Sequence, residues 1–204
     1  TTVYSGPISI SSSTDLRFYS TDNANNSESV RTETYIINPP SCPRMTLNSP
    51  NGWEIIPSGS QYTINWCPSS NAVKFDLFYS INNGTAWKSI VSKITNTSYN
   101  WRVPCPNNNK MVSLVMVIGY NSSGAVVGYD VSNYTFTIEV IKVLSPNGGE
   151  YLKAGTTQTI SWRTNCTIRP VTKVELYYTT GGGIWNPITT LGGGTSWVWK
   201  DLLR

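Results

Sequence analysis

The chain has 204 residues, a formal net charge of +4 and no histidine. Charged residues make up only 13% of it, against roughly 25% in an average soluble protein. Asn, Ser, Thr, Gly and Tyr take their place, which is typical of secreted, extracellular and cell-surface proteins. The missing histidine excludes Ser-His-Asp and Cys-His triads and every imidazole metal ligand. We expect neither nucleic-acid binding nor membrane insertion, because no stretch forms a basic track and the apolar run at 111–120 is far shorter than the ~20 residues of a membrane-spanning helix.

An internal repeat organises most of the sequence. Ser-Pro-Asn-Gly-Trp-Glu at 49–54 recurs as Ser-Pro-Asn-Gly-Gly-Glu at 145–150. Further matches follow in the same order: Gly59 with Gly155, 62–66 with 158–162, 74–79 with 173–178, Trp87 with Trp185 and Trp101 with Trp199. Matches of this length indicate two copies of one structural unit.

Within each unit the pattern indicates short strands separated by turns. Residues 73–79 alternate between apolar and polar, 61–66 are rich in β-branched and aromatic residues, and Asn-Gly and Ser-Gly turn signals lie between such runs. The chain is therefore predicted to be all-β, built from tandem immunoglobulin-like antiparallel β-sandwiches of which the first and last are incomplete. Four tryptophans on repeated strand positions are predicted core residues: Trp66, Trp162, Trp101 and Trp199.

The repeated motif resembles a known family. Ser-Pro-Asn-Gly-Gly-Glu at 145–150, Gly155, Ile160-Ser161-Trp162 and the later Lys-Val-Glu-Leu strand resemble the Ig-like modules of yeast cell-wall glucan-assembly proteins and of secreted bacterial repeat proteins. The resemblance covers residues 47–199. Residues 1–38 differ, and through 4–10, 16–23 and 32–35 they resemble the second half of the Ig-like domain that ends chitobiase and β-hexosaminidase enzymes. That resemblance implies an accessory domain without catalytic residues.

These patterns predict four segments: a partial Ig-like β domain at 1–38, a Pro-rich linker at 39–45, repeat one at 46–140, and repeat two at 141–204 without its last strands. Repeat one continues far past Trp101, whereas repeat two stops shortly after the equivalent Trp199. An open sandwich exposes a sheet edge and a core face. Either the sequence is an excerpt from a longer chain, or another subunit completes the sandwich by strand addition.

The four cysteines lack Cys-x-x-Cys spacing, which favours disulfides over a metal or redox site. Counting strands places Cys42 and Cys67 at one pole of repeat one. The same count places Cys105 at the other pole, beside a loop of repeat two that contains Cys166. We therefore predict Cys42–Cys67 and Cys105–Cys166 bonds, each across a domain junction. The alternative is a Cys67–Cys105 bond within repeat one, with the other two cysteines free or paired elsewhere.

The sequence shows no group of residues with the spacing of a catalytic or metal-binding site. The acidic residues are scattered and suggest no glycosidase pair, so we expect no enzyme, no cofactor and no metal site. Glu54 and Glu150 recur at the same place in the motif, which predicts a turn or capping role for both. The loop at 22–26 is predicted to be a plain hairpin turn, with calcium binding as the alternative.

These observations predict a non-catalytic extracellular protein with a structural or adhesive role: a stiff array of Ig-like modules acting as a spacer, matrix component or filament subunit. Its expected partners are other copies of itself or other surface proteins. The alternative is a carbohydrate-binding accessory region of a cell-wall- or polysaccharide-active enzyme, because eight Trp and twelve Tyr offer faces for pyranose rings. Trp53 and Trp197 have no tryptophan at the equivalent repeat position and are the candidates for carbohydrate or partner contact.

Overall fold

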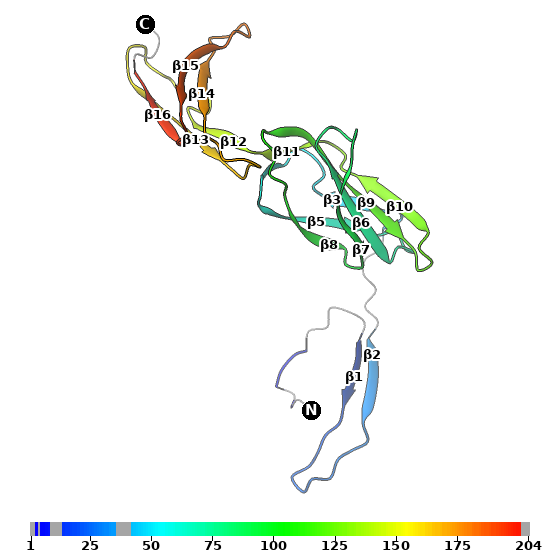
Figure 1. Cartoon of the computed structure of the whole chain (residues 1–204). Helices are drawn as coiled ribbons and strands as arrows, with labels where there is room; N and C mark the ends of the chain where they lie inside the picture. Colours follow the sequence, from blue (N-terminus) through cyan, green and yellow to red (C-terminus); the bar gives the residue numbers. More distant parts are fainter. Residues whose placement is uncertain (1–2, 4, 9–13, 36–41, 201–204) are drawn as a thin grey trace. The chain divides into compact units, whose positions relative to one another are not determined.

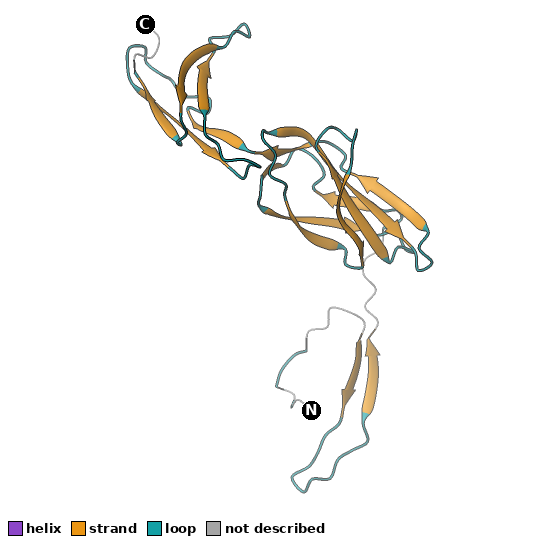
Figure 2. Ribbon diagram, viewed as in Figure 1, coloured by secondary structure: helices purple, strands orange, loops and turns teal. Residues whose placement is uncertain are grey.

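The computed structural model describes residues 3, 5–8, 14–35 and 42–200, so the first part of the predicted Pro-rich linker, 39–41, lies outside the described residues. All regular elements in these ranges are strands, which confirms the all-β prediction (Figure 2). No helix long and apolar enough to cross a membrane occurs in them. Contacts divide the chain into two units, Thr1–Ser41 and Cys42–Arg204.

In the first unit, residues 14–35 form one hairpin. Strand β1 (Thr14–Phe18) pairs antiparallel with β2 (Arg31–Tyr35), and none of the residues described in this unit is buried. The loop between the strands turns on Asp22, whose carboxylate accepts hydrogen bonds from the backbone amides of Ala24 and Asn26 at 2.9 Å and from the Asn26 side chain at 3.0 Å. These bonds make the loop a turn, as predicted.

Repeat one is a sandwich of two sheets (Figure 1). The smaller sheet has the order β3-β5-β8, and the larger has the order β4-β11-β9-β6-β7 with β10 also paired to β9. The strands are β3 (Thr46–Ser49), β4 (Ile55–Pro57), β5 (Gln61–Cys67), β6 (Lys74–Ser80), β7 (Lys88–Ile94), β8 (Ser98–Arg102), β9 (Lys110–Tyr120), β10 (Val126–Val131) and β11 (Phe136–Glu139). All pairs are antiparallel except β4 with β11, which is parallel.

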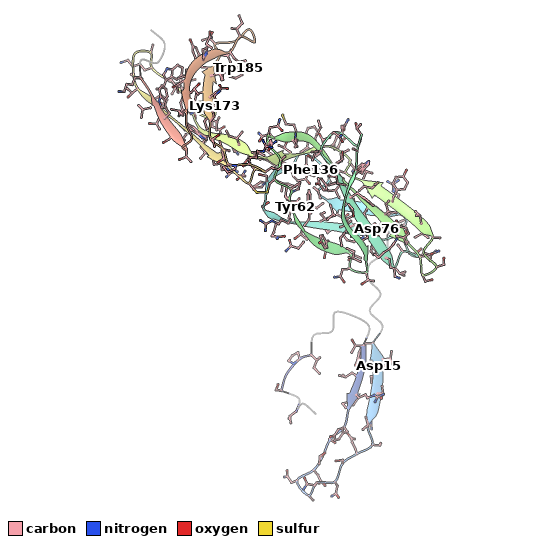
Figure 3. All side chains as sticks on the ribbon, viewed as in Figure 1. Asp15, Tyr62, Asp76, Phe136, Lys173 and Trp185 are labelled. Atoms are coloured by element: carbon pink, nitrogen blue, oxygen red, sulfur yellow. A yellow bond between two sulfur atoms is a disulfide. The ribbon has the colours of Figure 1, made fainter. Side chains whose placement is uncertain are left out.

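The core of repeat one lies between these sheets, where alternate residues of facing strands meet. Trp66 packs edge-on against Phe75, with ring centroids 5.3 Å apart, and Trp101 packs edge-on against Phe136 at 6.4 Å. Phe136 points into the space between the sheets (Figure 3). Truncating an aromatic side chain in such a core costs about 3–5 kcal/mol, so these contacts are central to the stability of repeat one.

Repeat two reproduces only part of this plan. A sheet of order β12-β13-β16 corresponds to β3-β5-β8, and a second sheet of β14 and β15 corresponds to β6 and β7. The strands are β12 (Ile141–Ser145), β13 (Gln158–Thr164), β14 (Val174–Tyr178), β15 (Asn186–Leu191) and β16 (Ser196–Trp199). Within residues 141–200 no strand corresponds to β9, β10 or β11. The last sandwich is therefore incomplete over the described residues, as the repeat comparison predicts.

The core of repeat two is correspondingly small. Ile160, Trp162 and Val174 are buried, and half-buried side chains pack around them. Trp199 is one of these half-buried residues, packed with its ring centroid 5.2 Å from that of Tyr178. The predicted core tryptophans thus lie inside the sandwiches, three of them buried and Trp199 at the open side of repeat two.

Candidate functional site: the joint between the repeats

The two repeats follow one another without a flexible linker. Strand β11 ends at Glu139 and β12 begins at Ile141, and the single residue between them, Val140, is buried. Asn109 holds this point of the chain with one side chain. Its Oδ1 accepts hydrogen bonds from the amides of Val140 (2.7 Å) and Ile141 (2.9 Å), and its Nδ2 donates to the Ile141 carbonyl (3.0 Å).

A disulfide joins the repeats beside this point. Cys105 follows the last strand of the small sheet of repeat one, and Cys166 lies in the loop after β13; the two are bonded, with Cα atoms 5.0 Å apart. Ser58 of repeat one donates its hydroxyl to the Cys166 carbonyl at 2.6 Å, and its own carbonyl accepts from the Cys166 amide at 3.4 Å. The Cys166 loop is therefore fixed to repeat one both covalently and by hydrogen bonds.

Gly59 allows this close approach. It has a φ of +75°, and a Cβ placed on it would lie 2.5 Å from the Cβ of Cys166. Any other residue at this position would overlap the disulfide as well as strain the backbone. Gly155, the equivalent residue of repeat two, has a φ of +74° but no atom near its missing Cβ. The recurring glycine thus allows the turn in both repeats, but only in repeat one does it also make room for the Cys166 loop at the joint.

An ion pair between a buried carboxylate and a half-exposed arginine completes the joint. Glu139 ends β11, and its side chain is 6% exposed; its Oε1 accepts hydrogen bonds from Arg163 Nη2 at 2.7 Å and Nε at 3.3 Å. Asn165 donates its side-chain Nδ2 to the Glu139 carbonyl at 2.8 Å and its backbone amide to the Val140 carbonyl at 2.6 Å. A buried carboxylate without its partner is costly, so the pair favours the arrangement in which Arg163 reaches Glu139.

The second disulfide joins Cys42 to Cys67, with Cα atoms 5.7 Å apart. Cys67 ends β5, and the Cys42 amide donates to the carbonyl of Pro68 at 2.9 Å, which holds the entering chain against the sandwich. Both disulfides of the structure are thus the pairs that the strand count predicts. The segment directly before Cys42 lies outside the described residues, so a role of this bond in a junction with residues 1–38 stays a prediction.

The two recurring glutamates close the opening turns of the repeats. Glu54 accepts hydrogen bonds from the amides of Asn51 (2.7 Å) and Gly52 (2.8 Å). Glu150 accepts from Asn147 and Gly148, both at 2.6 Å. The bond from Asn147 is the main reason that the pKa of Glu150 lies below its usual range. The turn role predicted from their recurrence is confirmed.

Repeat two presents an open groove of about 660 Å³. Among its lining residues are Ile160, Leu176, Ile188 and Trp199, which come from both sheets. In repeat one, β9 and β11 cover the corresponding region and place Val115 and Phe136 in the core. In repeat two, one edge of β14 pairs with β15, and no described strand pairs with the other.

The two candidate contact tryptophans differ in exposure. Trp53 is 77% exposed and lies beside Tyr134, with ring centroids 5.3 Å apart and ring planes inclined by 33°. Trp197 is half-buried and packs against the core of repeat two. Tyr134 was not singled out by sequence reasoning, because it is brought to Trp53 only by the fold. Trp185, near the turn before β15, is also exposed (Figure 3).

Neither a family model nor a curated protein matches the chain. Among solved structures, the fibronectin(III)-like modules of Clostridium thermocellum CbhA are similar at 16% identity, covering 47% of this chain and 95% of that one, with a TM-score of 0.34. The FN1–FN3 domains of chicken CNTN1 are similar at 13% identity, covering 92% of this chain and 67% of that one, with a TM-score of 0.30. The immunoglobulin-like architecture therefore rests on the strand order of the repeats themselves.

Proposed function

We propose that the chain is a non-catalytic extracellular structural or adhesive protein, a stiff array of Ig-like modules that acts as a surface spacer, matrix component or filament subunit. The observation that carries this proposal is the joint, where the Cys105–Cys166 bond, the Glu139–Arg163 pair and the Asn109 side chain all restrain the same short connection. A freely moving pair of domains needs none of these restraints. The two disulfides and the low charge support secretion into an oxidising environment.

The test is a distance distribution between spin labels, one on each repeat. We expect a single narrow distribution in the oxidised protein. The Cys105→Ser/Cys166→Ser variant should give a broader one, because only the polar contacts then restrain the joint. A Cys42→Ser/Cys67→Ser variant is the matched control, since it removes a disulfide outside this joint and should leave the distribution narrow. A broad distribution in the oxidised wild-type protein would refute the stiff-array proposal.

We further propose that an added strand completes the open face of repeat two. Repeat one provides the pattern, because β9 pairs with β6 and places Val115 and Val117 in the core. A synthetic peptide with the sequence of β9 is the probe, and its control has Asp in place of both valines. Slower hydrogen exchange in β14 with the first peptide alone is the expected result, and equal exchange with both would contradict it. Concentration-dependent self-association would identify a second copy as the natural donor.

The second candidate function is a carbohydrate-binding accessory region of a cell-wall- or polysaccharide-active enzyme. The exposed indole of Trp53 beside the Tyr134 ring supports it, since exposed aromatic rings bind the apolar faces of sugars. Cosedimentation of the whole chain with insoluble glucan and chitin tests this function. Retention above that of a protein without exposed Trp is expected, and failure to bind any polysaccharide would leave only the structural proposal.

A further inference from the structure

Trp53 occupies a backbone conformation that its side chain disfavours. Its φ is +71°, in the left-handed region, and the equivalent residue of repeat two is Gly149 with a φ of +81°. A non-glycine residue in this region costs on the order of 1 kcal/mol or more, and such residues gather at functional sites. Burial does not offset this cost, because the side chain is 77% exposed. The large aromatic at this position is therefore not explained by the stability of the turn.

The surrounding backbone holds the two rings in place. The Trp53 amide donates to the Thr135 carbonyl at 2.9 Å, and the Tyr134 amide donates to the Asn51 carbonyl at 3.2 Å. Asn51 also accepts the Asn133 amide on its Oδ1 at 2.7 Å. The turn that carries Trp53 and the segment that carries Tyr134 are thus tied together on both sides of the ring pair.

Close packing adds to these hydrogen bonds. A Cβ on Gly52 would collide with the Cβ of Tyr134, so only glycine lets the two segments come this close. On the other side of the turn, the Glu54 carboxylate accepts the amides of Asn51 and Gly52. A ligand that stacks on these rings therefore meets a surface that is already ordered, which reduces the entropy lost on binding.

The chemistry of the pair and its neighbours fits a neutral sugar. A pyranose ring has an apolar face of C–H groups and a rim of hydroxyls. Trp53 and Tyr134, the latter 59% exposed, offer adjoining aromatic surface, and the exposed Asn133 beside them offers an uncharged amide. Glu54 is the one charged residue among the contacts described above, and both of its oxygens already bind backbone amides. An ionic ligand would find no counter-charge in this set of contacts.

We propose that Trp53 and Tyr134 form a stacking platform for the neutral pyranose units of a polysaccharide. This inference rests on the second candidate function and locates its site in repeat one. The opening turn of repeat two has glycine in place of Trp53, so the platform belongs to repeat one alone. The two modules thus share a framework and differ in surface chemistry.

The decisive variant is Trp53→Gly, because it installs the residue of repeat two. It removes the indole, and glycine adopts the positive φ of this position without strain, so the variant should unfold at the same or a higher temperature than the wild type. Affinity electrophoresis in gels containing a neutral soluble β-glucan or a neutral soluble mannan, with cosedimentation on chitin, is the measurement. We expect binding to weaken by about tenfold or more in Trp53→Gly and in Tyr134→Ala, and to persist in Tyr134→Phe, which keeps the ring.

The matched control is Trp185→Ala, which removes another exposed tryptophan and should leave binding unchanged. Binding that persists in both Trp53→Gly and Tyr134→Ala would overturn the platform while leaving the carbohydrate function in place. Equal loss in the Trp185→Ala variant would also overturn it. If the wild-type chain binds none of these polysaccharides, both the platform and the carbohydrate function fail together.

Discussion

The carboxylate of Glu150 shows how one side chain sets the pH response of a turn. Hydrogen bonds from backbone amides, that of Asn147 first, lower its pKa in the folded protein. A group whose folded pKa is lowered contributes stability that is present above its unfolded pKa and is lost as the pH falls through the folded value. The turn that opens repeat two should therefore stay closed at neutral pH and loosen in acid.

This expectation is tested by following the amide resonances of Asn147 and Gly148 in an acid titration. Both should shift together, with a midpoint below the ordinary pKa of glutamate. Glu150→Gln is the control, because its side chain does not titrate and should abolish the shift. Amides that show no transition in the wild-type protein would contradict the assigned hydrogen bonds.

Asp76 is a second residue whose carboxylate organises its surroundings. It lies buried on β6, where it accepts the Lys93 amide at 2.7 Å and the Tyr120 hydroxyl at 2.9 Å. Lys93 Nζ lies 3.5 Å from the Asp76 carboxylate and 3.2 Å from the centroid of the Tyr120 ring. The hydrogen bond to Asp76 is the main cause that raises the pKa of Tyr120.

We expect Asp76→Ala to destabilise the protein by roughly 2–4 kcal/mol, because it leaves the Lys93 amide and the Tyr120 hydroxyl without their partner. Lys93→Ala is the control and should cost less than about 1 kcal/mol, since this lysine is half-exposed and its backbone amide remains bonded. Urea unfolding measures both. Similar losses would mean that the ion pair, and not the buried hydrogen bonds, stabilises this region.

The hydrogen bond between Tyr120 and Asp76 also makes the stability of the protein depend on pH in the alkaline range. Since the pKa of Tyr120 is raised in the folded state, its stabilising contribution is full below the unfolded pKa of tyrosine and is lost as the pH rises through the higher folded value. Phenolate absorbance should show a late-ionising fraction in the wild-type protein that contains Tyr120 and also Tyr79, whose pKa is raised by burial. In Asp76→Ala, the part of this fraction that belongs to Tyr120 should move toward the ordinary range while Tyr79 stays late; an unchanged titration would contradict the assignment.

At the scale of elements, the turn after β4 shows how a repeated glycine acquires a second role. Gly59 and Gly155 share a positive φ, but only Gly59 faces the Cys105–Cys166 bond. Alanine at either position should cost on the order of 1 kcal/mol for the backbone. At position 59, the added methyl also overlaps Cys166, which should cost about 1–3 kcal/mol more.

Denaturant unfolding of Gly59→Ala and Gly155→Ala separates the two effects. The loss in Gly59→Ala should exceed that in Gly155→Ala, and the excess should shrink when the Cys105–Cys166 bond is replaced by two serines. Equal losses of unfolding free energy in the two variants would show that the close contact between Gly59 and the Cys166 loop does not affect stability.

At the scale of the whole unit Cys42–Arg204, the joint depends on charge as well as on the disulfide. Arg163→Ala leaves the Glu139 carboxylate buried without its partner, so the spin-label distance distribution between the repeats should broaden although the disulfide is intact. Because Arg163 is itself about half-exposed, the loss in stability should be modest, about 1–2 kcal/mol. Arg169→Ala, which removes an exposed arginine in the loop after β13, is the control and should change neither; a narrow distribution in Arg163→Ala would contradict the role of the pair.

The sequence alone predicted the strands, the repeat and the core tryptophans, and it favoured the two disulfides of the structure over a Cys67–Cys105 bond. The alternation of apolar and polar residues that marks a strand is a local property of the sequence. The number of strands between two cysteines then indicates whether they lie at the same end of the sandwich. The turn role of Glu54 and Glu150 was also predictable, because their partners lie only two or three residues away.

Apart from the cysteines, only the tertiary structure decided which distant residues meet. Glu139 and Arg163 lie in different repeats, and Trp53 and Tyr134 lie in the first and last thirds of one sandwich, so no spacing in the sequence pairs them. The same holds for the half-buried place of Trp197, which depends on how two sheets close over a small core. Such contacts arise from packing between segments far apart in the chain, and packing follows from the shape of the whole fold and not from the order of neighbouring residues.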